Sequence, residues 1–151
     1  MARPLKIGRH AIISVVLWVI TATACTSTIV RPVEPVPSLS HVCIRENPRV
    51  LVHDFVPVVR DVLSQHGIRS DVFSGETPAH CEVILTYTAL RRWDLGSYLS
   101  HAEVRLERDG LQIGYAEYHL RGGGGFSLFK WQGTRTKMEP VLNELLAQVG
   151  R

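Results

Sequence analysis

The sequence predicts an α+β fold, a two-layer sandwich in which a mainly antiparallel sheet of about four to five strands packs against two helices on one face. Two observations support this prediction. Two segments carry apolar residues at helical spacing, and the segments between them alternate apolar and polar residues as half-buried strands do. A helix that is apolar on one side needs an apolar partner, and a sheet with one apolar face supplies it.

The first predicted helix begins near Asp54, which can cap it, and ends at Gly67, which suits the left-handed residue that follows many helices. Pro57 is tolerable because it falls in the first turn. A strand containing His41 precedes this helix, and a short strand over Ile68–Phe73 follows it. One apolar stripe with spacings of three and four residues defines the helix: Phe55, Val58, Val59, Val62 and Leu63.

Three longer strands are predicted next, over Cys81–Leu90, His101–Arg108 and Leu111–Leu120. In the first two, apolar residues that alternate along the strand are expected to face the core: Val83, Leu85, Tyr87 and Ala89, then Ala102, Val104 and Leu106.

The Asp-Gly dipeptide that ends at Gly110 indicates a hairpin between the last two strands. A two-residue turn would pair Ala102 with Glu117 and bury that carboxylate, which is costly without a partner. We therefore predict a three-residue loop with a bulge at Gly110. It pairs Ala102 with Ala116 and places Glu117 opposite His101 on the outer face, while four residues face inward: Gly114, Ala116, Tyr118 and Leu120.

A second helix is predicted to close the chain. Thr136 and Glu139 have capping-box spacing, but Pro140 lacks an N–H, so a start near Pro140 is the alternative. The glycines of 122–125 predict an exposed turn with positive φ, and the alternative is a mobile loop that closes on a partner. The helix has one apolar stripe: Met138, Val141, Leu142, Leu145, Leu146 and Val149.

Residues 1–24 have the pattern of a secretory signal peptide. Arg3, Lys6 and Arg9 form a basic region, and the apolar run Ala11–Ile20 is shorter than the roughly 20 residues that span a bilayer. Small residues follow, at 21–24. An uncleaved membrane anchor is the alternative.

Cys25 comes directly after Ala22-Thr23-Ala24, which resembles a lipobox, although Ala22 stands where Leu is usual. We expect cleavage before Cys25 and lipidation of its thiol. Because one acyl chain gives only marginal membrane binding, stable anchoring needs the two or three chains that lipoproteins carry. The alternative is a chance cysteine behind an ordinary cleavage site, which would give an unlipidated periplasmic protein.

The expected organisation is a signal peptide (1–24), the lipidated cysteine with a proline-rich tether (25–40) and a single globular domain (41–151). The tether contains Pro32, Pro35 and Pro37, and proline-rich chain is extended at about 3.1 Å per residue. The remaining 110 or so residues suffice for one hydrophobic core.

The net charge excludes a nucleic-acid binder. Three of the 17 Lys and Arg lie in the signal peptide, which leaves 14 basic against 14 acidic residues in the mature chain. Binding to nucleic acid requires a basic excess for phosphate contacts.

The two remaining cysteines, Cys43 and Cys81, are predicted to form a disulfide, because an exported protein meets an oxidising compartment. The cross-link would stabilise the fold by about 4 kcal/mol in the chain-entropy model. The alternative is a zinc site that adds His41 and His80 to the two thiolates.

The chain resembles the Sbal-type family of small proteobacterial lipoproteins, over most of the mature domain. The resemblance implies a lipoprotein of the cell envelope, in the outer membrane and facing the periplasm, and Thr26 after the cysteine agrees with that sorting. It supplies no catalytic residues. It rests on these blocks: 40–44, 46–48, 80–82, 86–90, 98–102, 114–119, 124–126 and 130–131.

No nucleophile elbow, metalloprotease helix or phosphate loop is present in the sequence. We therefore expect a non-enzymatic binding or support module without cofactor or assigned metal. The alternative is a hydrolase-type enzyme or a metal-binding protein that uses His101, Glu117 and His119, which share the outer face.

Basic residues mixed with aromatic ones indicate a ligand-binding surface for an anionic glycolipid or another envelope partner, because Arg binds phosphate bidentately and aromatic rings lie at membrane interfaces. The alternative is a solvated basic edge with buried Trp. The candidate residues come from two segments: Arg91, Arg92 and Trp93, then Arg121, Lys130 and Trp131.

Overall fold

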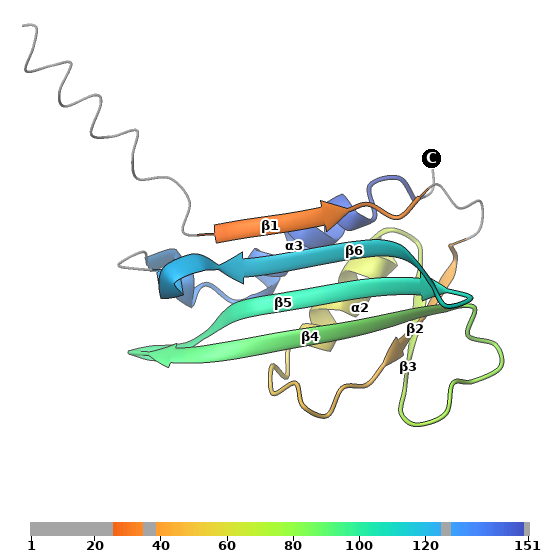
Figure 1. The fold of residues 1–151 in the computed structure, drawn as a ribbon, viewed down its shortest axis with the longest axis horizontal. Helices are drawn as coiled ribbons and strands as arrows, with labels where there is room; N and C mark the ends of the chain where they lie inside the picture. Colours follow the sequence, from red (N-terminus) through yellow and green to blue (C-terminus); the bar gives the residue numbers. More distant parts are fainter. Residues whose placement is uncertain (1–25, 35–38, 125–127, 150–151) are drawn as a thin grey trace, which may run out of the picture.

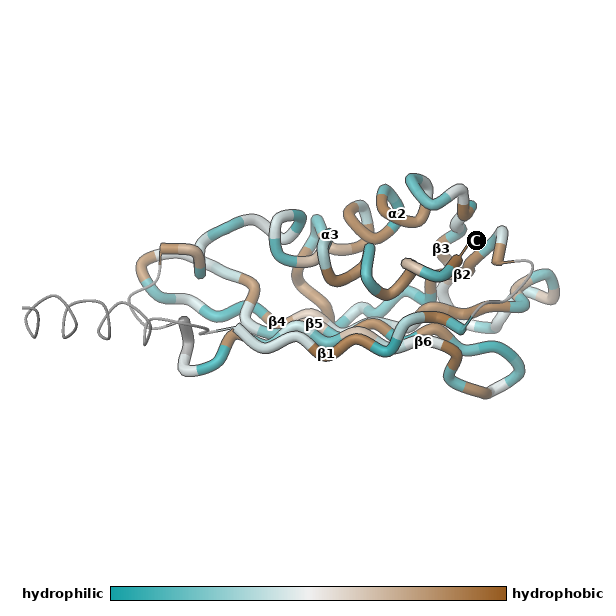
Figure 2. The backbone as a smooth tube through the Cα atoms, turned by 90° about the horizontal axis from the view of Figure 1, so that it is seen from above, coloured by the Kyte–Doolittle hydropathy of each residue, from teal (hydrophilic) through white to brown (hydrophobic). Residues whose placement is uncertain are grey.

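The computed structural model describes residues 26–34, 39–124 and 128–149. A six-stranded sheet forms one layer, and two α-helices cover one of its faces (Figures 1 and 2). The predicted α+β two-layer sandwich is confirmed in this coarse sense. Among the described residues, no helix is long and apolar enough to cross a membrane.

The sheet is larger and more mixed than predicted. Its strand order is β1-β6-β5-β4-β2-β3. Strands β4 (Val83–Asp94), β5 (Gly96–Arg108) and β6 (Leu111–Leu120) form the expected antiparallel meander, whereas β2 (His41–Arg45) runs parallel to both β3 (Arg69–Phe73) and β4. The parallel β2–β3 pair follows from the helix that connects the two strands, as in any crossover connection.

The sixth strand corrects the predicted tether. Thr26–Arg31 forms β1, an edge strand antiparallel to β6, instead of linker. After it, Val33 is fully buried and its N–H donates to the carbonyl of Leu145, 2.8 Å away. Gly114 is required beneath this segment, since a Cβ there would lie 2.7 Å from Val33 Cγ2. The folded domain therefore begins directly after Cys25.

The β5–β6 hairpin also differs from the prediction. Asp109 and Gly110 both have positive φ and form a two-residue turn, and the register shifts between Leu106 and Glu107. The bulge thus lies inside the hairpin and not at the turn. The bulge keeps Glu117 on the outer face. In the strand register Glu117 lies opposite Glu103 and not opposite His101. The inward-facing residues are as predicted: Gly114, Ala116, Tyr118 and Leu120.

The first helix is α2 (Phe55–Gln65), and its predicted apolar stripe is buried. Gly67 has φ +74°, and the backbone N–H groups of Ile68 and Gly67 donate to Leu63 and Ser64 carbonyls in a Schellman arrangement. Asp54 occupies the N-cap position but makes no capping hydrogen bond. Its carboxylate instead pairs with Arg91.

The second helix, α3, runs over Thr134–Leu145 and begins before the predicted capping box. Gly133 is its N-cap residue, and Pro140 lies inside the helix. Two short 3₁₀ segments, η1 (Arg121–Gly124) and η2 (Leu128–Trp131), connect β6 to α3. The apolar stripes of α2 and α3 and the inner face of the sheet enclose one core.

Candidate functional site

A disulfide joins Cys43 and Cys81, as predicted, with the two Cα atoms 5.7 Å apart. Around it, His41 Nε2 lies 2.8 Å from Asp71 Oδ2, and His80 Nε2 lies 3.9 Å from the same oxygen. Two histidines therefore approach the cysteine pair, as the zinc alternative requires. Both sulfurs are committed to the disulfide, however, so the oxidised protein lacks the thiolate ligands of that alternative.

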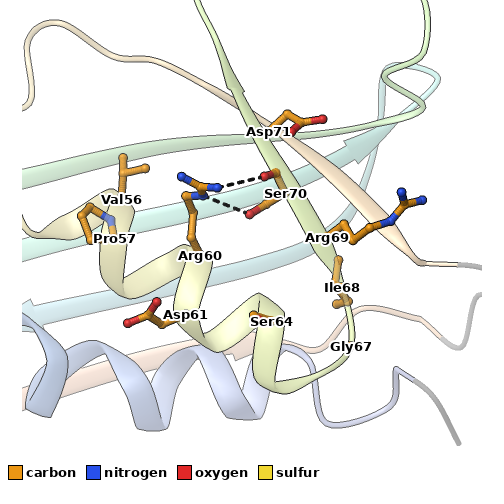
Figure 3. Close-up of a pocket in the computed structure, with 10 residues that line it drawn as sticks. All are labelled: Val56, Pro57, Arg60, Asp61, Ser64, Gly67, Ile68, Arg69, Ser70 and Asp71. Atoms are coloured by element: carbon orange, nitrogen blue, oxygen red, sulfur yellow. Dashed lines mark hydrogen bonds between the residues drawn. The ribbon is translucent and has the colours of Figure 1, made fainter.

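An open cavity of about 840 Å³ lies at the β3 edge of the sheet, between α2 and β3 (Figure 3). Arg60 spans it: its Nε and Nη2 donate to the side-chain and backbone oxygens of Ser70, each at 3.4 Å. Of the predicted ligand-binding or metal-ligating residues, none lines this cavity. It is a groove along an edge strand.

The structure brings His101, Glu117 and His119 together on the face of the sheet that the helices leave open. His101 lies opposite His119 in the β5–β6 pairing, with the two rings edge-to-face at 5.5 Å. His101 Nδ1 is 3.7 Å from Glu117 Oε1, which is too long for a hydrogen bond. This nitrogen is buried and has no hydrogen-bond partner.

The carboxylate of Glu117 is held from its other side. Tyr115 Oη donates to Glu117 Oε2 at 2.9 Å. Burial, then this hydrogen bond and the negative charges of Glu103 and Glu117, raise the pKa of Tyr115 to about 12, so the phenol keeps its proton. One oxygen of Glu117 is thus fixed, and the other faces His101.

The predicted basic–aromatic residues gather at the end of the sheet where β1 begins (Figure 1). Trp93 lies at the tip of the β4–β5 hairpin with 79% of its surface exposed, and Arg121 in η1 donates to Ser27 of β1. Phe129, an aromatic residue of the same basic stretch, is 71% exposed here, and two apolar residues that the sequence pattern did not single out are also exposed: Leu95 (85%) and Leu128 (79%).

Lys130 and Trp131 have a different role from the predicted one. Lys130 is buried, and its ammonium pairs with Asp94 and lies 4.4 Å from the centre of the Trp131 ring. Trp131 Nε1 donates to the backbone carbonyl of Asp94 at 2.9 Å. These contacts fasten η2 to the tip of the β4–β5 hairpin.

Lys137 was not among the predicted site residues. It is 7% exposed on α3, and its ammonium donates to the backbone carbonyls of Leu99 and Lys130 and lies near the rings of Tyr98 and Tyr118. Burial lowers the pKa of Lys137 to about 8. The signal was available: Lys137 stands four residues before Val141 and so falls within the apolar stripe of the helix.

Comparison with known proteins shows a fold and no sequence family. No model of a protein family and no curated protein matches the chain. PelC from Paraburkholderia phytofirmans, solved as a dodecamer, superposes with a TM-score of 0.54 and 13% identity over 82% of this chain and 98% of PelC. A point variant of the same PelC superposes with a TM-score of 0.55 and 12% identity over 83% of this chain and 99% of the variant.

A minor lipoprotein from Acinetobacter baumannii is a more distant structural neighbour, with a TM-score of 0.37 and 13% identity over 73% of this chain and 91% of its own. This score is too low to support an argument. The PelC superpositions, which cover nearly all of those chains, show that this protein shares the PelC fold.

Proposed function

We propose that this protein is a lipid-anchored, non-enzymatic module of the bacterial cell envelope whose domain lies directly on the membrane surface, in the outer membrane and facing the periplasm. The observation that carries the proposal is the start of β1 at Thr26, immediately after the candidate lipidation site Cys25. With no tether between anchor and sheet, acyl chains on Cys25 would hold this end of the sheet at the bilayer. The position of Cys25 itself lies outside the described residues.

The side chains at this end suit a membrane interface. Trp93 and Leu95 project from the hairpin tip, and Leu128 and Phe129 from η2 beside it; all four are at least 71% exposed. Apolar and aromatic side chains insert at the boundary between headgroups and acyl chains, where a Trp ring is favoured.

Three arginines belong to the same end of the sheet, one of them, Arg91, paired with Asp54. Arg91 and Arg92 precede Trp93, and Arg121 follows β6 next to the first residues of β1. Arginine binds phosphate bidentately, and each basic residue near an anionic membrane contributes about 1 kcal/mol of attraction. The chemistry therefore favours a bilayer with anionic lipid or glycolipid phosphates.

The anchor is tested by the intact mass of the protein purified from membranes. A lipid-sized addition on Cys25 is expected, together with recovery in the outer-membrane fraction of a density gradient. A chain that starts at Cys25 without added lipid, or one that retains residues 1–24, would disprove lipid anchoring.

The docking surface is tested separately with an unlipidated Cys25→Ser protein and vesicles with or without an anionic lipid. Tryptophan fluorescence of this protein without residues 1–24 should shift to the blue with anionic vesicles, and Trp93→Phe should abolish the shift. Leu128→Ala with Phe129→Ala should weaken vesicle binding several-fold. The matched control is Leu51→Ala with Leu111→Ala, because these two leucines are exposed to a similar degree (71% and 72%) but lie outside the proposed surface. Equal binding by both double variants, or no binding by either, would refute the docking surface.

A second candidate function is assembly of identical subunits, since the PelC chains that share this fold were solved as dodecamers. The sheet has two open edges, β1 and β3, with Ile29 and Val72 partly exposed on them. Unpaired edge strands are templates for association with another chain. Native mass spectrometry of the lipidated protein in detergent tests this: a single multimer supports assembly, and monomer alone at micromolar concentration excludes it.

A further inference from the structure

The outer face of the sheet carries a cluster of three residues, His101, Glu117 and His119, none of which belongs to the proposed membrane-docking surface. We propose that His101, Glu117 and His119 bind one divalent transition-metal ion of the zinc class, through one imidazole nitrogen from each histidine and one carboxylate oxygen. This site is independent of lipid anchoring.

The geometry is that of a nearly formed site. One ligand atom from each of the three residues lies within 4.8 Å of the other two. Around tetrahedral zinc, with metal–ligand distances of about 2.0–2.2 Å, neighbouring ligand atoms are about 3.4 Å apart. The observed separation of 3.7 Å between His101 Nδ1 and Glu117 Oε1 is close to this value. Small side-chain rotations, mainly of the exposed His119, would complete the site.

The unsatisfied nitrogen of His101, the first proposed ligand, also supports a metal site. His101 Nδ1 is buried without a hydrogen-bond partner, an arrangement that costs free energy unless something satisfies the atom. The carboxylate oxygen that faces it is too distant to do so and is itself an acceptor that needs positive charge. A cation between the two would satisfy both atoms.

The second ligand has the support that metal-binding carboxylates usually have. Tyr115 donates to Glu117 Oε2, which leaves Oε1 to point toward His101.

Among the described residues, Glu117 forms no salt bridge with Lys or Arg; His101 is its only charged-pair neighbour. Glu103 lies directly opposite Glu117, and like charges in that position destabilise a sheet. Arg105 pairs with Glu103, and Arg105 and Arg31 lie over the Tyr115 ring at 5.8 and 6.0 Å. A bound divalent ion would neutralise the second carboxylate.

The donor set indicates the metal class and leaves coordination open. Two imidazoles and a carboxylate suit Zn²⁺, and Cu²⁺ and Ni²⁺ as competitors, more than Mg²⁺ or Ca²⁺. His101 and His119 also line a cavity of about 410 Å³, together with Arg91 and Arg92. A fourth position on the metal would therefore be accessible to water or a small anion.

The experiment uses the lipidated protein in detergent, without reductant, so that Cys43 and Cys81 remain a disulfide. After treatment with a chelator, binding of Zn²⁺ alone is measured by calorimetry and native mass spectrometry. The variants are His101→Ala with His119→Ala, and Glu117→Gln. The matched control is His41→Ala with His80→Ala, which removes the histidine pair at the disulfide. Thermal unfolding without metal verifies that each variant is folded.

One Zn²⁺ per chain is expected in the wild type and in the His41/His80 control. Glu117→Gln should weaken binding by at least the roughly 10–100-fold that loss of an outer-shell partner costs, and the His101/His119 variant should lose binding. Cobalt(II) in the wild type should give the intense visible bands of four-coordinate geometry, which His119→Ala alone removes. The proposal is overturned if the wild type retains no zinc at micromolar concentration, or if the His41/His80 variant loses the ion and the His101/His119 variant keeps it.

Discussion

Lys137 makes the stability of this domain depend on pH in an unusual direction. The pKa of its buried ammonium is lowered from 10.5 to about 8, so between these values the unfolded chain binds more protons than the folded chain. The free energy of unfolding therefore rises with pH in this window. Each pKa unit corresponds to 1.36 kcal/mol, so the 1.5 units from pH 8 to 9.5 give a gain of about 2 kcal/mol over neutral pH.

The measurement is urea unfolding of the Cys25→Ser protein at several pH values from 7 to 9.5. This variant has no free thiol that could exchange with the disulfide at alkaline pH. Tyr115 and Tyr118 act in the opposite sense, because burial raises the pKa of each, but their effect falls mainly above about pH 10, where the unfolded phenols lose their protons. The upper limit of pH 9.5 therefore isolates the lysine.

Lys137→Met is the matched variant, because it keeps the length of the side chain and removes the charge. Its stability should not rise between pH 7 and 9.5. A flat profile in the parent protein, or an equal rise in both proteins, would show that burial does not destabilise the ammonium of Lys137.

Three further changes have expected effects on the free energy of unfolding, each measured by urea titration under oxidising conditions. Replacing Cys43 and Cys81 by alanine should cost about 4 kcal/mol, since the cross-link no longer restricts the unfolded chain; an unchanged midpoint would contradict this. Gly114→Ala should cost about 1–3 kcal/mol, because the new methyl overlaps Val33, and it fails as a prediction if stability rises. Phe55→Ala should cost about 3–5 kcal/mol by leaving a cavity in the core, and a loss below 1 kcal/mol would speak against its central place.

The elements that could be predicted from the sequence are those whose signal is local. The apolar stripe from Phe55 to Leu63 and the alternation from Val83 to Ala89 each need one neighbouring layer, so periodicity alone identifies them. The predicted inward and outward faces of these elements agree with the structure, and so does the outward position of Glu117 on β6.

The errors concern partners that are distant in the sequence. The strand Thr26–Arg31 is followed at once by Pro32, and nothing local shows that β6 has an open edge to receive it. The predicted three-residue hairpin loop was wrong. A bulged loop and a bulge within the strand both put Glu117 on the outer face, so the burial argument could not distinguish them. Sequence pattern distinguishes the faces of a strand but not the residue at which a register shifts.

The candidate site shows the same division. That His101, Glu117 and His119 share a face followed from alternation, but their convergence depends on the register and on Tyr115, which was not considered. Trp93 and Phe129 come from separate segments, the hairpin tip and η2, which lie side by side because Lys130 of η2 pairs with Asp94 of the tip.

Strand β1 also sets the order in which the domain can be completed. Ser27 and Arg121, which meet at the end of the β1–β6 pair, are 94 residues apart in the chain. During synthesis the segment that is made first must therefore stay unpaired until nearly the whole chain has been made. Closing so long a loop is a slow step in folding. The last event in the maturation of this protein is thus expected to be the docking of its first strand, which seals the edge of β6.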